Sequence, residues 1–204
     1  MARELKVLLH SSKDGDQSKQ KTTVPQPVRW RVACTERLLL RSLRLEDAEA
    51  LHCLIFADAK VMQFGDGVQS LEWTQRWIRS HCKADPTLAE DLQPHAGPWA
   101  VVLRKSGEVI GYCGLFSMIV HGTPELELGY RLGHSYWGLG LATEAAQAVL
   151  GYARNTLGLK RLIALIDPGN TRSMAVAKKI GMTKESEVMC EGYDHPDDVY
   201  SCVL

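Results

Sequence analysis

The sequence predicts an α+β fold in which helices flank one mixed β-sheet. Two observations lead to this prediction. The chain of 204 residues is 45% hydrophobic and 24% charged, which is typical of a globular protein long enough to bury one proper core. Runs of strand length and runs of helical periodicity follow one another in the order β-α-α-β-β-β-α-β-α-β-β, an order that favours one sheet with helices packed against it.

The chain begins with a polar leader. Residues 11–29 are mostly Ser, Lys, Asp, Gln, Thr and Pro, and they contain almost nothing that could be buried. We therefore expect residues 1–34 to form a flexible N-terminal extension and residues 35–204 to form the folded domain.

Helical periodicity dominates the first half of this domain. After a strand predicted over 37–43, Glu46 and Asp47 open a helix whose apolar positions continue to Ile55. A second helix is predicted over 70–82, because its apolar residues share one face. The polar segment that follows, 83–97, is predicted to be a loop.

Strand signals follow in the middle of the chain. Three strands are predicted over 99–104, 109–116 and 125–132, and the turn at Lys105-Ser106-Gly107 makes the first two a hairpin. A helix over 141–156 and a strand over 161–166 come next. Asp167-Pro168-Gly169-Asn170 then turns the chain into a helix that Gly181 terminates. The last elements predicted are this helix and a closing hairpin, over 171–180, 183–190 and 198–203.

Charge and cysteine usage exclude several functional classes. Lys plus Arg equals Asp plus Glu, so no overall field attracts nucleic acid or an anionic membrane, and no apolar stretch approaches the ~20 residues of a membrane span. The six cysteines form no Cys-x-x-Cys pair and have no metal-ligand spacing with the histidines, so we expect no metal site. Free thiols indicate a reducing compartment and predict a cytoplasmic protein. Cys113 is expected to be a buried core residue rather than a nucleophile.

The junction before residue 141 contains Gly138 and Gly140. Glycine allows a positive φ and a close approach of the backbone to a ligand, and the N–H groups of the following helix can bind phosphate. The spacing is not that of a P-loop, and Thr143 occupies the third glycine position of a dinucleotide-binding turn. From the residues alone, an ordinary turn and a site for another phosphate ligand remain alternatives.

The surrounding motifs resemble a known family. Trp137-Gly-Leu-Gly-Leu-Ala-Thr-Glu-Ala is followed by Gly158-Leu-Lys-Arg, by an Asn-x-x-Ser pattern at Asn170 and Ser173, and by Lys179-Ile-Gly-Met. In this order they resemble the GNAT superfamily of acyl-CoA N-acetyltransferases, within it the branch of RimJ and RimL type, which Thr35-Glu-Arg-Leu-Leu-Leu-Arg also fits. The resemblance implies a mostly antiparallel sheet whose central strands splay apart.

By this resemblance the co-substrate is acetyl-CoA. Backbone N–H groups of the glycine turn would hold the pyrophosphate, and the pantetheine arm would enter between the strands over 125–132 and 161–166. Trp137 replaces the usual first residue of the turn, so it either contacts the ligand or packs beside it. Asn170 would cap its helix and also reach the arm. The cofactor-binding residues expected are Tyr130, Arg131, Leu132, Trp137, Gly138, Leu139, Gly140, Leu141, Ala142, Thr143, Asn170 and Ser173.

Acetyl transfer requires an amine that has lost its proton, and a carboxylate in the cleft can accept that proton. Strand alternation places Glu125, Glu127, Gly129 and Arg131 on one face, and Glu127 is the base that position and resemblance favour, with Glu125 as the alternative. The tyrosine that often protonates the leaving thiolate in this family is absent, because its position holds Val176 or Ala177. Ser173 is therefore the candidate acid, with water as the alternative.

The sequence thus predicts an N-acetyltransferase that moves an acetyl group from acetyl-CoA to the primary amine of a protein N-terminus or a small molecule by direct attack. A catalytically inactive acyl-CoA-binding regulatory module is the alternative. The amine would enter between the first two helices and the last hairpin, past residues 64–67, Trp73, Trp77, Tyr193, Asp194 and His195. The oligomeric state is not defined by the sequence, although homodimers are common in this family.

Overall fold

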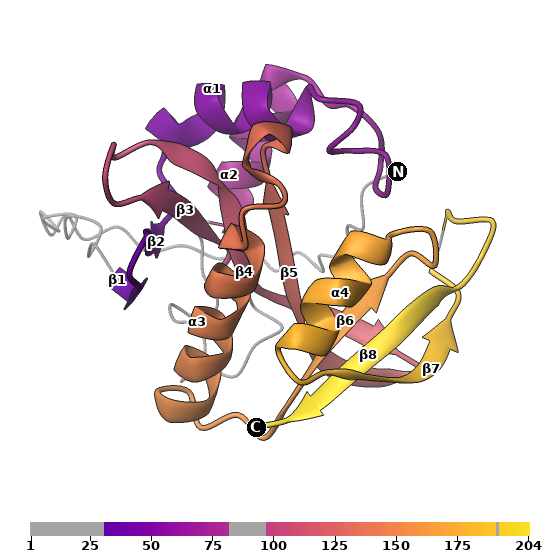
Figure 1. Ribbon diagram of the computed structural model, residues 1–204. Coiled ribbons are helices and arrows are strands. Elements are labelled where there is room, and N and C mark those ends of the chain that lie inside the picture. Colours follow the sequence, from indigo (N-terminus) through magenta and orange to yellow (C-terminus); the bar gives the residue numbers. More distant parts are fainter. Residues whose placement is uncertain (1–30, 82–96, 191) are drawn as a thin grey trace, which may run out of the picture.

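The computed structural model describes residues 31–81, 97–190 and 192–204, which form one eight-stranded sheet with helices on both faces (Figure 1). The strand order is β1-β2-β3-β4-β5-β6-β8-β7. The strands are β1 (Arg31–Cys34), β2 (Leu38–Ser42), β3 (Trp99–Leu103), β4 (Val109–Val120), β5 (Thr123–Leu132), β6 (Arg161–Ile166), β7 (Thr183–Val188) and β8 (Asp197–Val203). The mixed, mostly antiparallel sheet predicted from the sequence is confirmed.

Apart from the short 3₁₀ turn at His134–Tyr136, which the sequence did not predict, the helices also lie where the sequence predicts them. The first is a continuous helical run whose geometry changes from 3₁₀ to α to π along its length. The elements are η1 (Leu45–Asp47), α1 (Ala48–Leu51), η2 (His52–Phe56), α2 (Leu71–His81), η3 (His134–Tyr136), α3 (Leu141–Asn155) and α4 (Thr171–Lys179). The loop predicted over 83–97 and the polar leader over 11–29 lie outside the described residues, apart from Gly97.

The structure differs from the sequence prediction at two places. β1 pairs with β2, so the sheet contains residues 31–34 of the expected N-terminal extension. β4 and β5 are also longer than predicted, because their antiparallel pairing continues without a shift to Val120 and Thr123. The turn between them places His121 at φ 51 and Gly122 at φ 77, and this tight reversal keeps the two strands in register.

Two apolar cores lie on opposite faces of the sheet. On one face, α3 and α4 pack through residues such as Ala146 and Ala177 against buried strand residues, including Leu40 and Leu128. On the other face, Leu51, Ile55 and Ile78 of the first helices pack against Tyr112 of β4 and its neighbours. Cys113 is fully buried, as predicted, and burial raises the pKa of its thiol. Every described cysteine is free.

The sheet opens at its centre. β5 and β6 are parallel neighbours, but they share a single register pair, Glu127 with Ile163. β6 in contrast pairs with β8 from Arg161 to Ile166. The two central strands therefore diverge from the Glu127–Ile163 pair toward their carboxyl ends, which is the splay that the sequence prediction required.

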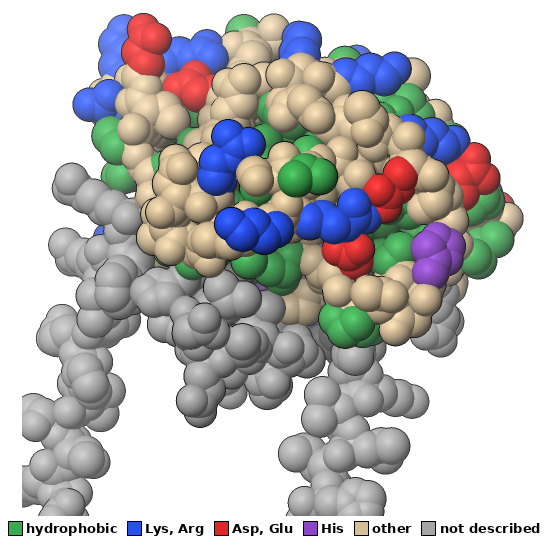
Figure 2. Space-filling model, turned by 90° about the horizontal axis from the view of Figure 1, so that it is seen from below, with side chains coloured by type: hydrophobic (Ala, Val, Ile, Leu, Met, Phe, Trp, Pro, Cys, Tyr) green, Lys and Arg blue, Asp and Glu red, His purple; other side chains and the backbone are tan. Residues whose placement is uncertain are grey.

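The surface of the described residues carries mixed charge. On the face shown in Figure 2, basic and acidic side chains lie near one another at several places, which agrees with the zero formal net charge of the chain. Among the residues that the structure describes, no helix combines the length and the apolar character needed to span a bilayer.

Candidate active site

A cleft of about 890 Å³ opens where β5 and β6 diverge. β5, the glycine turn, β6 and α4 contribute to its lining at one end, and α2 with the segment after η2 contributes at the other. The residues predicted for cofactor binding and catalysis all line this cleft, with the exception of Leu139. Leu139 instead exposes 55% of its surface, and its carbonyl accepts a hydrogen bond from Arg37.

The strand pattern of β5 decides which backbone groups face the cleft. The N–H of Gly133 donates to the carbonyl of Ile110 in β4 at 2.9 Å. Because backbone groups alternate in direction along a strand, every second residue before Gly133, such as Arg131 and Gly129, also directs its N–H and C=O toward β4. Tyr130 and Leu132 direct theirs into the gap beside β6. Tyr130 and Leu132 are therefore better placed than Arg131 for the predicted backbone contacts, because Arg131 pairs with Tyr112 in the β4–β5 ladder. The carbonyl of Leu132 already accepts a hydrogen bond from Trp137 Nε1 at 2.8 Å.

The glycine turn presents donors to the cleft. Gly138 and Gly140 have φ of 75° and 76°, a left-handed conformation that strains any side chain. Gly140 is the N-cap of α3 and has no side chain to cap it. Among the described residues, the N–H groups from Gly138 to Thr143 have no hydrogen-bond acceptor. These donors and the positive end of the α3 dipole fit a pyrophosphate group.

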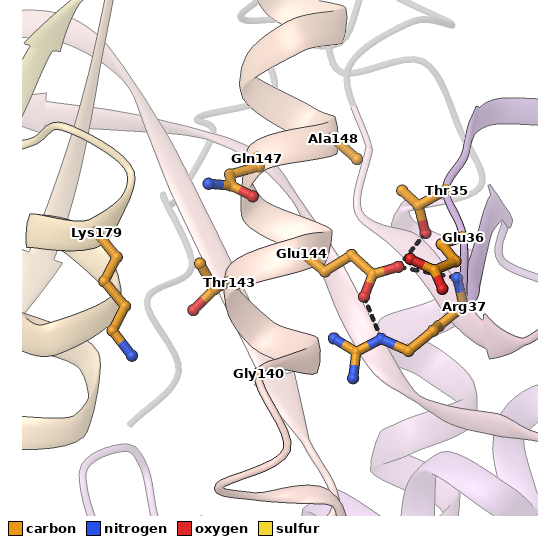
Figure 3. A pocket seen from close by; sticks show the side chains of 9 residues that line it. All are labelled: Thr35, Glu36, Arg37, Gly140, Thr143, Glu144, Gln147, Ala148 and Lys179. Atoms are coloured by element: carbon orange, nitrogen blue, oxygen red, sulfur yellow. Dashed lines mark hydrogen bonds and ion pairs between the residues drawn. The ribbon is translucent and has the colours of Figure 1, made fainter.

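An ion pair fastens the turn to the start of the domain (Figure 3). Arg37 Nε lies 2.6 Å from Glu144 Oε2, and Arg37 Nη1 donates to the carbonyl of Leu139 at 2.9 Å. The other oxygen of Glu144 accepts from Thr35 Oγ1 at 2.5 Å and from the N–H of Arg37 at 3.0 Å. Burial raises the pKa of Glu144, but the hydrogen bonds from Thr35 and Arg37 outweigh it and hold this pKa below its ordinary value.

Trp137 combines the two alternatives that the sequence left open. Its half-buried ring packs against both apolar cores, and it also lines the cleft. The guanidinium of Arg172, from α4, lies 5.0 Å from the centre of this ring, in cation–π contact. Trp137 thus links the turn, β5 and the first turn of α4.

The start of α4 brings two hydroxyl groups together. Asn170 caps the helix by accepting a hydrogen bond from the N–H of Ser173 at 3.1 Å, which confirms the predicted cap. Tyr130 Oη lies 3.4 Å from Ser173 Oγ, at the edge of hydrogen-bond distance. Burial raises the pKa of Tyr130 to about 12, so its hydroxyl keeps its proton at neutral pH.

The two glutamates proposed as the base differ in their contacts. Glu125 Oε1 accepts a hydrogen bond from Arg161 Nε at 3.0 Å, and Arg161 also pairs with Glu185, so Glu125 belongs to a surface ion-pair network. Glu127 is half-buried, lines the cleft and occupies the point where β5 and β6 diverge. Position therefore favours Glu127 over Glu125 as the group that faces the reacting atoms.

Aromatic side chains line the opposite end of the cleft. Phe56 contacts Trp73 and Trp77 edge-on with ring centroids 5.1 Å apart, and it stacks with Tyr112 at 6.0 Å. Trp73 and Trp77 thus pack against the core and line the cleft as well. Gly129 forms no bulge, since the β4–β5 register runs through it unbroken, and a Cβ there would lie 2.9 Å from the ring of Phe116.

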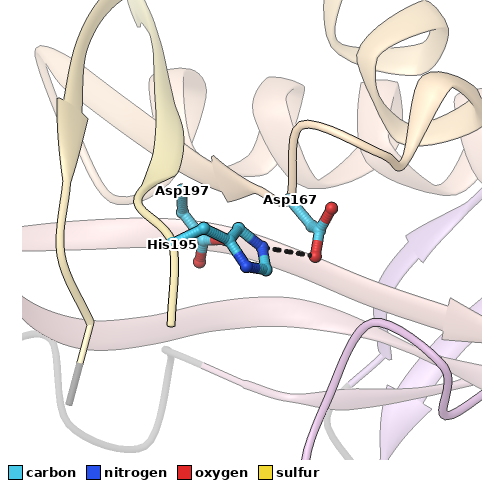
Figure 4. Close-up of side chains that lie close together, drawn as sticks. All are labelled: Asp167, His195 and Asp197. Carbon is cyan, nitrogen blue, oxygen red and sulfur yellow. Dashed lines mark hydrogen bonds and ion pairs between the residues drawn. The ribbon is translucent and has the colours of Figure 1, made fainter. Parts of the chain in front are cut away.

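A histidine lies beside this end together with Asp167 and Asp197 (Figure 4). His195 Nε2 lies 3.0 Å from Asp167 Oδ2, and its Nδ1 lies 2.7 Å from Oδ1 of the neighbouring Asp194. The hydrogen bonds with Asp194 and Asp167 raise the pKa of His195. Donor atoms of Asp167, His195 and Asp197 lie within 4.8 Å of one another, a grouping that the sequence spacing did not predict. Tyr193, Asp167 and Asp197 line the cleft.

Sequence reasoning missed two contacts of the site. Thr35 and Arg37 belong to the motif that opens the domain, but nothing in one sequence indicates that Glu144 is their partner. Tyr130 was predicted for its backbone groups, and its hydroxyl beside Ser173 was not foreseen. Strand alternation could have found it, because Tyr130 lies on the face of β5 opposite to Glu127.

Comparisons with known proteins agree with this geometry. Residues 37–183 match the family described as Acetyltransferase (GNAT) domain. The uncharacterized N-acetyltransferase p20 of Bacillus licheniformis is 34% identical over 151 residues, which cover 74% of this chain and 82% of that protein.

Solved structures share the fold. An acetyltransferase of the GNAT family from Bacillus anthracis superposes with a TM-score of 0.70 at 28% identity, covering 83% of this chain and 96% of that one. RimL, a ribosomal L7/L12 alpha-N-protein acetyltransferase solved in complex with coenzyme A, gives a TM-score of 0.69 at 20% identity, covering 86% and 98%.

Proposed function

The chain belongs to the GNAT acetyltransferase family, and from this premise we propose that it acetylates a primary amine by direct attack on acetyl-CoA. Acetyl-CoA is the co-substrate of this acetyltransferase. The acceptor is a small-molecule amine or the N-terminal amine of a protein. Direct attack is proposed because the cleft holds a carboxylate for the amine proton, and no cysteine stands among the described residues that line it. Cys113 of β4, next to the cleft-lining Tyr112, is buried with the pKa of its thiol raised.

One observation carries the proposal. The diverging strands β5 and β6 form a cleft with unpaired backbone donors of the glycine turn at one end and Glu127 at the point of divergence. The N–H groups from Gly138 to Thr143 would hold the pyrophosphate. The gap-facing backbone of Tyr130 and Leu132 would align the pantetheine arm as an extra strand, so that the thioester reaches Glu127.

Each group then has a defined role in the reaction. Glu127 accepts the proton of the attacking ammonium, directly or through a water, so that the nitrogen lone pair becomes available. The new C–N bond forms as the C–S bond breaks, negative charge passes to the sulfur, and the nitrogen releases a second proton to become a neutral amide. The hydroxyls of Tyr130 and Ser173 would stabilise the thiolate by hydrogen bonding, and this second proton reaches the sulfur through a water or through Tyr130 to give the CoA thiol.

A thiol-release assay tests the proposal. Acetyl-CoA is incubated with the full chain and a panel of amines that includes amino acids, polyamines, aminoalkyl phosphates and short peptides, and free CoA thiol is measured. We expect thiol release that depends on one class of amine, with the N-acetyl product identified by mass spectrometry. If CoA protects the chain from thermal unfolding and no amine is acetylated, the chain is an acyl-CoA-binding module and the enzymatic proposal is wrong.

A further inference from the structure

Arg131 lines the end of the cleft that is formed by α2 and the segment after η2, where we expect the acceptor amine to bind. It lies on the same face of β5 as Glu127, and its register partner on β4 is Tyr112. Burial raises the pKa of Tyr112, the charge of Arg131 lowers it, and the charges of Glu127 and Asp66 raise it. Arg131, Glu127 and Asp66 all line the cleft around this ring.

The guanidinium of Arg131 has weak partners. Its Nη1 lies 3.0 Å from the thioether sulfur of Met62, and its Nη2 lies 3.5 Å from the carbonyl of Phe64. Thioether sulfur is a poor acceptor, and 3.5 Å is too long for a strong hydrogen bond. Within residues 31–81, 97–190 and 192–204, no carboxylate oxygen lies within 4.0 Å of this half-buried guanidinium.

The other half-buried arginines of the domain behave differently. Arg41 makes a bidentate pair with Asp47, with both distances 2.7 Å. Arg161 contacts Glu125 and Glu185. Withdrawing a charge from water without an ionic partner is costly, so the position of Arg131 is the exception that calls for an anionic ligand.

Gly65 leaves room for this guanidinium. A Cβ at Gly65 would lie 2.2 Å from Arg131 Nη2 and 2.8 Å from Nη1, so a larger residue there would make the guanidinium shift from its present position against the segment after η2. Between Arg131 and Glu127, Gly129 contributes no side chain to the cleft floor. The ring of Phe116 covers Gly129, so a positive and a negative group lie on one strand face on either side of it, about 13 Å apart at their Cα atoms.

We propose that Arg131 binds an anionic group of the acceptor, so that the preferred acceptor carries a carboxylate or phosphate besides its amine. This inference rests on the proposed function and assigns the acceptor class of the same site. The ammonium meets Glu127 while the anion makes paired hydrogen bonds with Arg131, and the aromatic rings of Trp73 and Phe116 contact the carbon skeleton of the acceptor. Arg131 is thereby a specificity-determining residue.

Matched acceptor pairs test the inference. L-phenylalanine is compared with phenethylamine, which lacks only the carboxylate, and 2-aminoethyl phosphate with ethanolamine, so that the two anion types are distinguished. For the wild-type chain we expect the anion-bearing member of at least one pair to have the higher kcat/KM by about 10- to 100-fold, the value of a charge-assisted hydrogen-bonded pair. Arg131→Gln should abolish this preference, and Arg131→Lys should retain part of it.

Arg76→Gln is the matched control, because Arg76 is exposed on α2, where it forms an ion pair with Glu72. It should keep the wild-type preference. If Arg131→Gln lowers the rates of both members equally, Arg131 merely tethers the segment containing Met62, and the inference is wrong. Turnover confined to polyamines or to peptides without an anionic group near the amine also contradicts it, but leaves the proposed function standing. Absence of turnover with every amine removes the proposed function instead.

Discussion

Arg37 and Glu144 are 107 positions apart in the chain, and their side chains meet with Nε and Oε2 separated by 2.6 Å. Because Arg37 also donates to the carbonyl of Leu139, the pair fixes the glycine turn against the segment that leads into β2. Glu144 lies in the first turn of α3, where its negative charge also complements the helix dipole. The geometry of the proposed pyrophosphate site therefore depends on a residue far from it in sequence.

Glu144→Gln should raise the KM for acetyl-CoA by about threefold to tenfold with a smaller change in kcat, because the turn loses its charged anchor. Steady-state kinetics with varied acetyl-CoA measures this. Glu72→Gln, which removes an exposed ion pair on α2, is the control and should leave both constants unchanged. An unchanged KM in Glu144→Gln would show that the anchor does not position the turn.

The same substitution should change stability in a pH-dependent way. The folded-state pKa of Glu144 lies below its ordinary value of 4.5, so its contribution is present above that pH and is lost as the pH falls through the folded-state pKa. Denaturation by urea should therefore show a stability gap between wild type and Glu144→Gln at neutral pH that closes in acid. If the difference in free energy of unfolding stays constant down to low pH, the lowered pKa of Glu144 is not the source of the stabilisation.

Glu127→Gln should lower kcat/KM by about 10²- to 10⁴-fold if Glu127 accepts the amine proton. The variant should partly recover at high pH, because more of the free amine is then already neutral. A pH–rate profile of both proteins measures this difference. Glu125→Gln is the comparison, since that carboxylate pairs with Arg161 at the surface and should affect stability more than rate. Full activity of Glu127→Gln at neutral pH would remove it as the base.

Gly140→Ala should weaken CoA binding and lower the free energy of unfolding by about 1 kcal/mol, since an alanine is strained at φ 76°. The nearest atom to the added Cβ, Arg37 Nη2, is 3.5 Å away, so backbone strain rather than a clash is the cause. Gly151→Ala is the matched control. Gly151 lies within α3 with nothing within 4 Å of its added Cβ, and this change should stabilise the helix by about 0.5 to 1 kcal/mol.

Tyr130→Phe should lower kcat by about twofold to tenfold with little change in the KM for acetyl-CoA, because it removes a hydrogen bond offered to the leaving thiolate. With its pKa at about 12, Tyr130 should add no inflection to the pH–rate profile between about pH 6 and 9. A double-mutant cycle with Ser173→Ala tests whether the two hydroxyls act together. Fully additive losses would show that they act independently.

His195→Gln should destabilise the chain more at acidic than at alkaline pH. The folded-state pKa of His195 is raised above its ordinary value of 6.5 by Asp194 and Asp167, so its contribution is complete below that value. It is lost as the pH rises through the folded-state pKa. Thermal unfolding across this range measures the effect. If the difference in unfolding temperature between wild type and His195→Gln grows with pH, the ion pairs of protonated His195 with Asp194 and Asp167 do not stabilise the chain.

Local signals were sufficient to predict most of the fold. The helix α2 and the strand β6 follow directly from the pattern of apolar residues. Asn170 and Gly181 mark the two ends of α4, because Asn caps a helix start and Gly follows a helix end. β1 was missed because four residues next to a polar leader carry little periodic signal. Its pairing with β2 supplies the stability that its own sequence does not show.

The site likewise contains features that local sequence signals predict and features that arise only on folding. Glycine positions and the Asn–Ser spacing are local features, so the turn and the cap of α4 could be identified from the sequence. The side chain of Arg131 could not be assigned in this way, because its role is inferred from its weak contacts with Met62 and Phe64, which only the folded chain brings beside it. Contacts across the sheet, such as Arg37 with Glu144, are likewise created only by the tertiary structure.

The single register pair between β5 and β6 has a consequence for the proposed base. Glu127 is paired on both sides, with Phe116 of β4 and with Ile163 of β6, whereas the residues of β5 that follow it pair with β4 alone. The proposed base therefore stands on the one residue of β5 that both halves of the sheet hold in register.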